Sequence, residues 1–296
     1  DAEGRILALE ADTIASLGAY LSNFAPSIPG NSYPQTITGL YTTPQAYLRV
    51  RGAYANTLPV DAYRGSGRPE ATWVNERLLE NGAREMGIDV VEIRRRNLIP
   101  ANWFPFQTPM GRAYDSGDPP ALLDKLLAIA DYDGLRAEQD RLRGDGVCMG
   151  IGLACFLDKS GTGSSRNLAA KGGLHGGYES ALVRVHPDGK VTVLVGSHSH
   201  GQGHETAFCQ IAADRLKLPI EDISLVEGDT DRIPFGNGTW GSRSASVGGM
   251  AIVRAADRVV AKATRLAAHL LECATEDIVY QDGRFAVKGT DRRIEF

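Results

Sequence analysis

The sequence predicts an α+β fold in which mixed sheets pack against helices, and three observations support this class. The chain has 296 residues, about twice the usual length of one domain, so it can bury a sizeable core. Its composition, 43% hydrophobic and 23% charged, is typical of globular proteins. Strand-like and helix-like segments follow one another without the strict alternation of a parallel α/β sheet.

The first part of the chain reads as strands broken by proline and glycine. After Pro69, apolar residues recur at steps of three and four as far as Met86, and Gly87 is a typical C-terminal cap, so one helix is predicted here. A second helix is predicted from Asp118, an N-cap followed by two prolines, to about Ala130. The predicted strands are residues 6–10, 20–22, 47–54 and 58–60.

The charged, glycine-interrupted stretch 135–146 is the best candidate for a domain boundary, which we place near residue 145. The predicted domains are therefore residues 1–145 and 146–296. In the second domain the hydrophobic pattern predicts a buried strand, a hairpin across a Pro-Asp-Gly-Lys turn, and two helices. These elements are residues 147–156, residues 181–186 paired with 191–195, and residues 205–216 and 248–273.

Charge and cysteine usage exclude several classes of protein. With 32 Lys and Arg against 36 Asp and Glu, the net charge of −4 is unlike that of nucleic-acid binders. No apolar run approaches the roughly 18 residues of a membrane span, and no secretion leader opens the sequence. The four cysteines are far apart and form no C-x-x-C pair, which favours reduced thiols and a cytoplasmic location. Because the first residue is not Met, we expect a fragment or a processed chain.

The segment richest in polar residues and glycine is 196–206, Gly-Ser-His-Ser-His-Gly-Gln-Gly-His-Glu-Thr. It lies at a predicted strand-to-helix turn. The glycines on either side of Gln202 allow the backbone to approach a ligand closely. Free N–H groups at the start of the following helix favour an anion, so a bulky anionic cofactor would fit. The alternative is a tight turn that needs glycine only for its own dihedral angles.

His198, His200 and His204 suggest a competing metal site, because imidazoles two residues apart on a strand share a face. Two observations disfavour it: none of these three histidines has a carboxylate at the helical i, i+4 spacing, and helix capping explains Glu205 equally well. We therefore predict no metal ligand in this chain, and a histidine-metal hydrolase remains an alternative.

Residues 62–71, Ala-Tyr-Arg-Gly-Ser-Gly-Arg-Pro-Glu-Ala, form a second candidate loop at the entry to the first helix. This loop can place Arg64 or backbone N–H groups on an anion or an oxo group, or it can be a helix-entry turn with surface arginines. Residues 159–163 and 236–244 are further glycine-rich polar loops. Motifs for a phosphate loop, a dinucleotide site and a serine nucleophile elbow are absent. The basic run 94–96 is predicted to be a capped, solvated or interdomain face and is assigned no function.

Taken in order, residues 62–71, 201–206 and 241–244 resemble the molybdopterin-binding large subunit of the xanthine oxidase, aldehyde oxidase and carbon monoxide dehydrogenase family, the molybdenum hydroxylases. Residues 89–99 and 220–230 also look like family sequence. The family subunit is much longer than this chain. The resemblance places residues 1–145 at the end of its first molybdenum-cofactor-binding domain, with the connection, and residues 146–296 at the start of the second.

The resemblance also implies site residues. It makes Arg64, whose loop would face the metal, the one catalytic candidate. Carbon monoxide dehydrogenases of the family carry a copper-binding cysteine in that loop, where this chain has Gly65, so an aldehyde or N-heterocycle substrate is favoured over carbon monoxide. The cofactor is expected in its cytosine dinucleotide form. The implied molybdopterin contacts are Gly201, Gln202, Gly203, His204, Glu205, Thr206, Gly241, Ser242, Arg243 and Ser244.

The chemistry implied by the resemblance is oxidative hydroxylation with oxygen from water, in which the metal supplies the nucleophile and the electron sink and a glutamate acts as base. Glu70, Glu205 and Glu227 do not match that base, so the chain is expected to be catalytically incomplete alone. Its partners would be the rest of the large subunit and subunits that carry FAD and [2Fe–2S] clusters, because this chain lacks clustered cysteines. A non-catalytic binding or assembly module is the other alternative.

Overall fold

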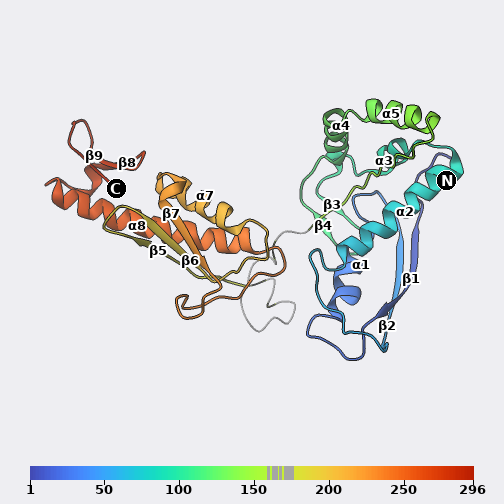
Figure 1. Cartoon of the computed structure of the whole chain (residues 1–296), viewed down its shortest axis with the longest axis horizontal. Helices are drawn as coiled ribbons and strands as arrows, with labels where there is room; N and C mark the ends of the chain where they lie inside the picture. The colour runs from blue at the N-terminus through green and yellow to red at the C-terminus, as the bar shows by residue number, and fades with distance from the viewer. Residues whose placement is uncertain (159–160, 162–165, 167–168, 170–176) are drawn as a thin grey trace. The chain divides into compact units, whose positions relative to one another are not determined.

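The computed structural model describes residues 1–158, 161, 166, 169 and 177–296, and the chain divides into two compact units, Asp1–Asp158 and Lys159–Phe296. Each unit combines helices with small sheets, which confirms the predicted α+β class (Figure 1). The domain boundary at residues 145 and 146 stays a prediction, because compactness alone defines these units. No helix in the described part of the chain is long and apolar enough to cross a membrane.

Unit 1 contains two short sheets and several helices. In chain order its elements are β1 (Leu9–Ser16), η1 (Ile28–Ser32), α1 (Tyr33–Thr36), β2 (Ala46–Ala53), α2 (Arg68–Met86), α3 (Val90–Asn97), η2 (Ala101–Trp103), β3 (Phe106–Gln107), β4 (Ala113–Tyr114), α4 (Pro119–Ile129) and α5 (Tyr132–Gly144). β1 and β2 are parallel, with Leu9 opposite Ala46, whereas β3 and β4 are antiparallel. The β1–β2 pair packs through Leu9 on a core that includes Tyr33, Ile37 and Ala71, and Figure 1 shows α2 alongside it.

Local signals explain where the two predicted helices of unit 1 begin and end. Asp118 caps α4 by accepting the N–H of Ala121 at 3.1 Å, and prolines occupy the first turn. Gly87 ends α2 with a φ of 65°, a left-handed conformation that residues with a Cβ rarely adopt. Both helices are confirmed.

Two short segments predicted as strands, residues 20–22 and 58–60, are loops in the structure. They lie beside a close crossing of two backbones, since a Cβ added to Gly18 would lie 2.4 Å from the carbonyl oxygen of Leu58. Pro59 has no N–H to donate to a sheet ladder. The apolar residues of these segments therefore belong to a pair of packed loops.

The charged stretch 135–146, next to the predicted boundary, is largely helical, and the strand predicted over residues 147–156 is wrong. Most of the first belongs to α5, whose exposed charges pair along the helix: Arg141 contacts the carboxylate of Glu138 at 2.7 Å. Residues 147–156 form no strand, because side chains take backbone carbonyls that a neighbouring strand would use. The amide of Gln139 donates to Met149 O at 2.7 Å, and Arg94 donates to Leu153 O at 3.0 Å.

The basic run 94–96 is divided between core and surface. Of the three alternatives for this run, a solvated face does not hold for Arg94, which is 1% exposed and donates through Nε to Glu76 Oε2 at 2.9 Å. The hydroxyl of Tyr41 donates to the other oxygen of Glu76 at 2.5 Å. Burial raises the pKa of Tyr41, so this hydroxyl keeps its proton as a donor. Arg94 thus joins α2, α3 and the segment after α5.

The buried ion pair between Arg94 and Glu76 predicts how substitutions change the stability of the protein. Glu76→Ala leaves Arg94 without a counterion in the core, and we expect it to lower the free energy of unfolding by about 3–5 kcal/mol. Glu76→Gln should cost less, because its amide oxygen still accepts one hydrogen bond. Asp124→Ala is the matched control, since Asp124 pairs with Arg95 at 2.6 Å on the surface, and its loss should cost at most about 1 kcal/mol. Urea unfolding measures all three, and equal small effects of Glu76→Ala and Asp124→Ala would contradict the assignment.

Unit 2 contains a mixed three-stranded sheet, two long helices and a C-terminal antiparallel sheet. In chain order its elements are β5 (Ala181–Val185), β6 (Val191–Val195), α7 (His204–Leu216), η3 (Ile220–Asp222), β7 (Ile223–Glu227), η4 (Ser244–Gly248), α8 (Gly249–Leu270), η5 (Thr275–Asp277), β8 (Ile278–Gln281), β9 (Arg284–Val287) and β10 (Arg293–Glu295). The predicted hairpin is confirmed as β5–β6, and the two predicted helices are confirmed as α7 and α8. β7 pairs in parallel with β6.

The core of unit 2 is formed where α7 and α8 pack on β6. Val191, Val193 and Val195 lie on one face of the strand, and each is at most 1% exposed. They pack against Phe208 of α7 and Ile252 of α8 in a single cluster. Figure 1 shows both helices beside the sheet. This packing fixes where each helix begins relative to the ends of the strands.

Candidate cofactor-binding site

The candidate site lies in unit 2, at the carboxyl ends of two parallel strands. Val195 at the end of β6 is the register partner of Glu227 at the end of β7. The segments that leave the two strands stay together, because the N–H of Gly228 donates to Ser197 O at 3.2 Å. α7 connects β6 to β7 and therefore begins near this edge. Ligand sites commonly form at the carboxyl edge of such strands.

The turn between β6 and α7 presents backbone donors. Gly201 and Gly203 have φ angles of 89° and 79°, and a Cβ added to either would meet open space. Among the described residues, no side chain caps α7, a 13-residue helix that begins at His204. Its first-turn N–H groups, which include those of the exposed Glu205 and Thr206, are therefore available to an anion.

A second loop, residues 235–244, is fastened to this turn by close backbone contact. A Cβ added to Gly196 would lie 2.3 Å from Gly236 Cα, so the approach requires glycine. Thr239 Oγ1 accepts the N–H of His198 at 3.0 Å and donates to the carbonyl of the same residue at 2.7 Å. The two loops therefore hold each other at the edge of the sheet.

Arg243 anchors the second loop from inside the protein. It forms an ion pair with Glu179 at 2.9 Å, and both side chains are fully buried. Its guanidinium also donates to the carbonyls of Gly177, Tyr178 and Gly238 at 2.7–3.0 Å. Two of the three guanidinium nitrogens of this predicted site residue are thus committed to its own loop and to the segment before β5, while Nε has no partner among the described residues.

The other predicted residues of the second loop lie beside Arg243. Gly241 and Ser242 have φ angles of 60° and 55°, which turn the chain sharply before η4. Ser244 at the start of η4 donates to Thr239 Oγ1 at 3.2 Å. Residues 201–206 and 241–244 therefore belong to two neighbouring loops at one edge of unit 2. Of the predicted loop 159–163, only Gly161 lies within the described residues, and its N–H donates to Ser242 O at 2.9 Å.

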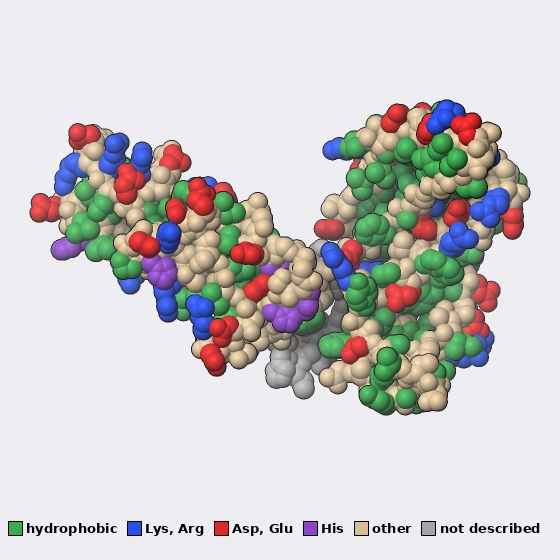
Figure 2. Space-filling model, in the orientation of Figure 1, with side chains coloured by type: hydrophobic (Ala, Val, Ile, Leu, Met, Phe, Trp, Pro, Cys, Tyr) green, Lys and Arg blue, Asp and Glu red, His purple; other side chains and the backbone are tan. Residues whose placement is uncertain are grey.

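The three histidines do not form a metal-binding triad. His204 is 6% exposed and engaged on both ring nitrogens, with Glu227 Oε2 at 2.9 Å and Gln202 Nε2 at 2.9 Å. His198 and His200 are exposed, with ring centroids 4.2 Å apart. Figure 2 shows histidine side chains at several separate places on the visible surface of this unit. Within the described ranges, no group of three His, Cys, Asp or Glu side chains could hold a metal ion.

The sequence patterns missed three residues that shape the site. Glu179 is paired with a residue 64 positions away, so local spacing gives no signal for it. Thr239 was noted only as part of a glycine-rich loop, yet it makes the contacts that join the two loops. Ser197 is fully buried, and its hydroxyl has no hydrogen-bond partner among the described residues. A serine that follows a strand is too common to indicate a site residue from sequence alone.

The Arg64 loop belongs to unit 1 and forms the tight entry to α2. Gly65, Ser66 and Gly67 all have positive φ angles, of 94°, 41° and 85°. A Cβ added to Gly67 would lie 2.6 Å from Tyr33 N, so the loop requires glycine there. Arg64 is exposed on this loop, and it makes no hydrogen bond with the described residues.

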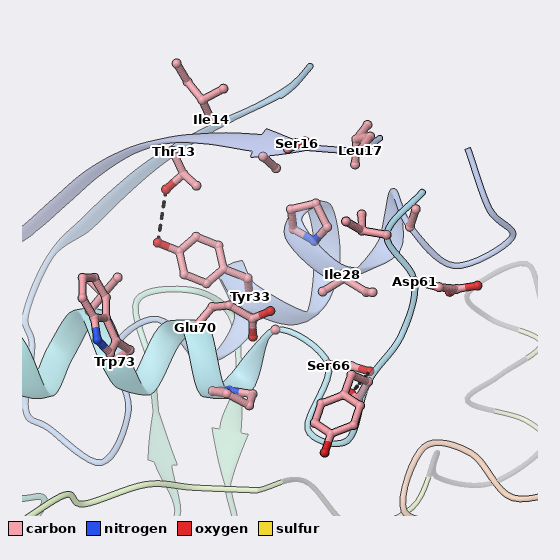
Figure 3. Close-up of a pocket in the computed structure, with 18 of the residues that line it drawn as sticks. Thr13, Ile14, Ser16, Leu17, Ile28, Tyr33, Asp61, Ser66, Glu70 and Trp73 are labelled. Atoms are coloured by element: carbon pink, nitrogen blue, oxygen red, sulfur yellow. Dashed lines mark hydrogen bonds between the residues drawn. The ribbon is translucent and has the colours of Figure 1, made fainter. Parts of the chain in front are cut away.

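The same loop borders a cavity of about 680 Å³ in unit 1. Figure 3 shows Tyr33 and Trp73 directed toward the cavity from α1 and α2, with Ser66 on the loop below. Tyr33 is held by a hydrogen bond between its hydroxyl and that of Thr13 at 3.2 Å. The cavity wall is mainly apolar, and Arg64, Asp61 and Glu70 supply charge at its border.

Comparison with known proteins relates both parts of the chain to molybdopterin-binding domains. Two models of the molybdopterin cofactor-binding domain match residues 1–98 and 125–296. The carbon monoxide dehydrogenase large chain of Hydrogenophaga pseudoflava is 39% identical over 299 residues, which cover 99% of this chain and 37% of that protein. The nicotine 6-hydroxylase large subunit of Paenarthrobacter nicotinovorans is 35% identical over 98% of this chain and 35% of its own length.

A solved structure supports the same relationship. Quinoline 2-oxidoreductase from Pseudomonas putida 86 superimposes with a TM-score of 0.83 and 36% identity, over 98% of this chain and 37% of that chain. The chain thus spans little more than a third of the length of the relatives it matches. Both halves of the sequence match the same cofactor-binding description, and the chain belongs to the molybdopterin cofactor-binding domain family of molybdenum hydroxylase large subunits.

Proposed function

We propose that this chain supplies molybdenum-cofactor contacts in an oxidoreductase that hydroxylates an aldehyde or an N-heterocycle with oxygen from water. The observation that carries the proposal is the uncapped start of α7 behind two glycines whose Cβ positions face open space. Pterin cofactors of this type carry phosphate, and a helix N-terminus with free N–H groups favours phosphate.

The described residues fit such a cofactor. Backbone N–H groups of the Gly203 turn and the first turn of α7 would hold its anionic part. The hydroxyl of Ser197, just after β6, is buried and lacks a partner among the described residues. When bound, the cofactor supplies the electron sink and activates water. Gln202, Ser242 and Ser244 would orient it from the two loops, and Arg243 would act by fixing the second loop through its buried ion pair.

The substrate class follows from the Arg64 loop and from the names of two relatives. Gly65 occupies the position where copper-containing members of the family are expected to carry cysteine, which disfavours carbon monoxide. Two relatives are named for quinoline and nicotine, and both of these compounds are N-heterocycles. Arg64, exposed at the border of the cavity, would place a cationic donor on the reacting oxygen of the substrate or the metal centre.

We expect further segments and subunits to complete the enzyme. No glutamate of this chain matches the family's catalytic base, so the 296 residues should be inactive alone. Electrons would pass to subunits that carry [2Fe–2S] clusters and FAD. The cofactor would be the cytosine dinucleotide form, and the enzyme would work in the cytoplasm.

The turn glycines provide a test of cofactor binding with an internal control. Gly203 and Gly189 have φ angles of 79° and 82°, and a Cβ on either would meet open space. Either glycine-to-alanine change should cost about 1–2 kcal/mol of stability through left-handed strain. Only Gly203→Ala should also lower the pterin retained per chain, by about tenfold, the effect of losing one good interaction. Pterin fluorescence after oxidation measures this, and equal retention by both variants would refute the role of the turn.

The role of Arg64 can be tested in the complete enzyme with its partner subunits. Arg64→Ala should leave the pterin content unchanged and lower kcat by about 100-fold, as for other donors that stabilise charge in a transition state. Arg77→Ala is the control, because Arg77 is exposed on α2 and pairs only with Glu80 at 3.1 Å among the described residues. Similar turnover by both variants would remove Arg64 from the catalytic machinery.

A further inference from the structure

Both the oxygen and the nitrogen of the Gln202 side-chain amide are hydrogen-bonded within the protein. These bonds determine which donor or acceptor the amide can present to a ligand. Its Oε1 accepts the backbone N–H of His200 at 2.5 Å. Its Nε2 lies 2.9 Å from Nε2 of His204. The other ring nitrogen of His204, Nδ1, lies 2.9 Å from Glu227 Oε2. The three side chains form one chain of hydrogen bonds from β7 to the turn before α7.

The directions of these hydrogen bonds follow from the group at one end. A backbone N–H can only donate, so the amide atom that faces His200 must be the oxygen. The amide nitrogen therefore faces His204 and donates to it, which requires Nε2 of the ring to be the acceptor. The ring proton is then on Nδ1, from which it is donated to the carboxylate of Glu227. The amide orientation and the tautomer are therefore determined by the hydrogen-bond network itself.

The surroundings of His204 keep the ring in place. It is 6% exposed and packs on the ring of Phe208, with centroids 4.7 Å apart. The side chain of Glu227 is 14% exposed. A doubly protonated ring would set an N–H against the amide N–H, and relieving that conflict would break the bond from His200. The arrangement therefore has one consistent pattern of donors and acceptors.

We propose that Glu227 and His204 are positioning residues that fix the Gln202 amide so that its second N–H is a donor toward the cofactor. That N–H has no partner among the described residues, and Gln202 is exposed between the two open glycines. The atom it meets must be an acceptor, such as an oxygen of the bound group. This inference rests on the proposed function for the identity of the ligand, but the hydrogen-bond chain stands on its own geometry.

The tautomer can be measured without cofactor. The full chain has six histidines, few enough for ¹⁵N-histidine labelling and long-range ¹H–¹⁵N correlation spectra, with His204→Phe to assign the signal. We expect His204 to carry its proton on Nδ1 and to have an unprotonated Nε2. A proton on Nε2, or a rapidly averaging ring, would overturn the inference.

A double variant separates positioning from folding. His204→Phe with Glu227→Leu removes both buried partners together, which avoids leaving one of them unpaired. We expect Tm to change little, while the side-chain amide signals of Gln202 become averaged and the retained pterin falls about tenfold, as for one lost hydrogen bond. His204→Gln, which can place an acceptor oxygen near the position of Nε2, should recover much of the pterin. A fixed Gln202 amide in the double variant would overturn the proposal.

The control is His186→Phe, the same change at a histidine that bonds Thr192 on the hairpin outside the site. It should leave both the Gln202 signals and the pterin content unchanged. If the wild-type chain shows the expected tautomer but binds no pterin under any loading condition, the ligand assignment fails and the proposed function fails with it. If pterin binds but the tautomer is reversed, the positioning proposal alone fails.

Discussion

The site depends on one buried interaction, the ion pair between Glu179 and Arg243. Both side chains are completely shielded from water, so each charge requires the other. Arg243 also satisfies three backbone carbonyls, two just before β5 and one in its own loop. These contacts connect the loop around Arg243, which has no regular structure, to the segment that leads into β5. The close contact of Gly196 with Gly236 places this loop against the end of β6.

With that loop fixed, the carboxyl edge of the sheet presents the uncapped first turn of α7, whose N–H groups are backbone donors. β6 and β7 deliver two segments to the same edge, and α7 and η4 begin there. The left-handed glycines of the first turn keep side chains away from these donors. The polar side chains nearby are mostly paired with each other, as in the chain from Glu227 through His204 to Gln202. Such an edge suits a large anionic cofactor better than a bare metal ion.

Local chemistry made several elements predictable. Asp118 with its prolines and Gly87 after an apolar stripe marked the limits of helices, and the Pro-Asp-Gly-Lys turn marked the hairpin. Patterns of hydrophobicity failed where tertiary partners decide the outcome. In the sequence Arg94 cannot be distinguished from its two basic neighbours, but it is buried because it pairs with Glu76 on another helix. Residues 147–156 are apolar enough for a strand, yet side chains from two helices occupy their carbonyls. Glu179 could not be identified at all, because its partner is 64 residues away and no local pattern connects them.

We propose that this chain holds molybdopterin through the two loops of unit 2. The most direct measurement is metal analysis by inductively coupled plasma mass spectrometry on the purified chain, combined with identification of the oxidised pterin in the same sample. Cells that synthesise the cofactor should yield protein with molybdenum close to one equivalent per chain, together with a cytosine-containing pterin. Stoichiometric zinc without pterin, or a chain that stays free of molybdenum and pterin when its cofactor supply is ample, would contradict the claim.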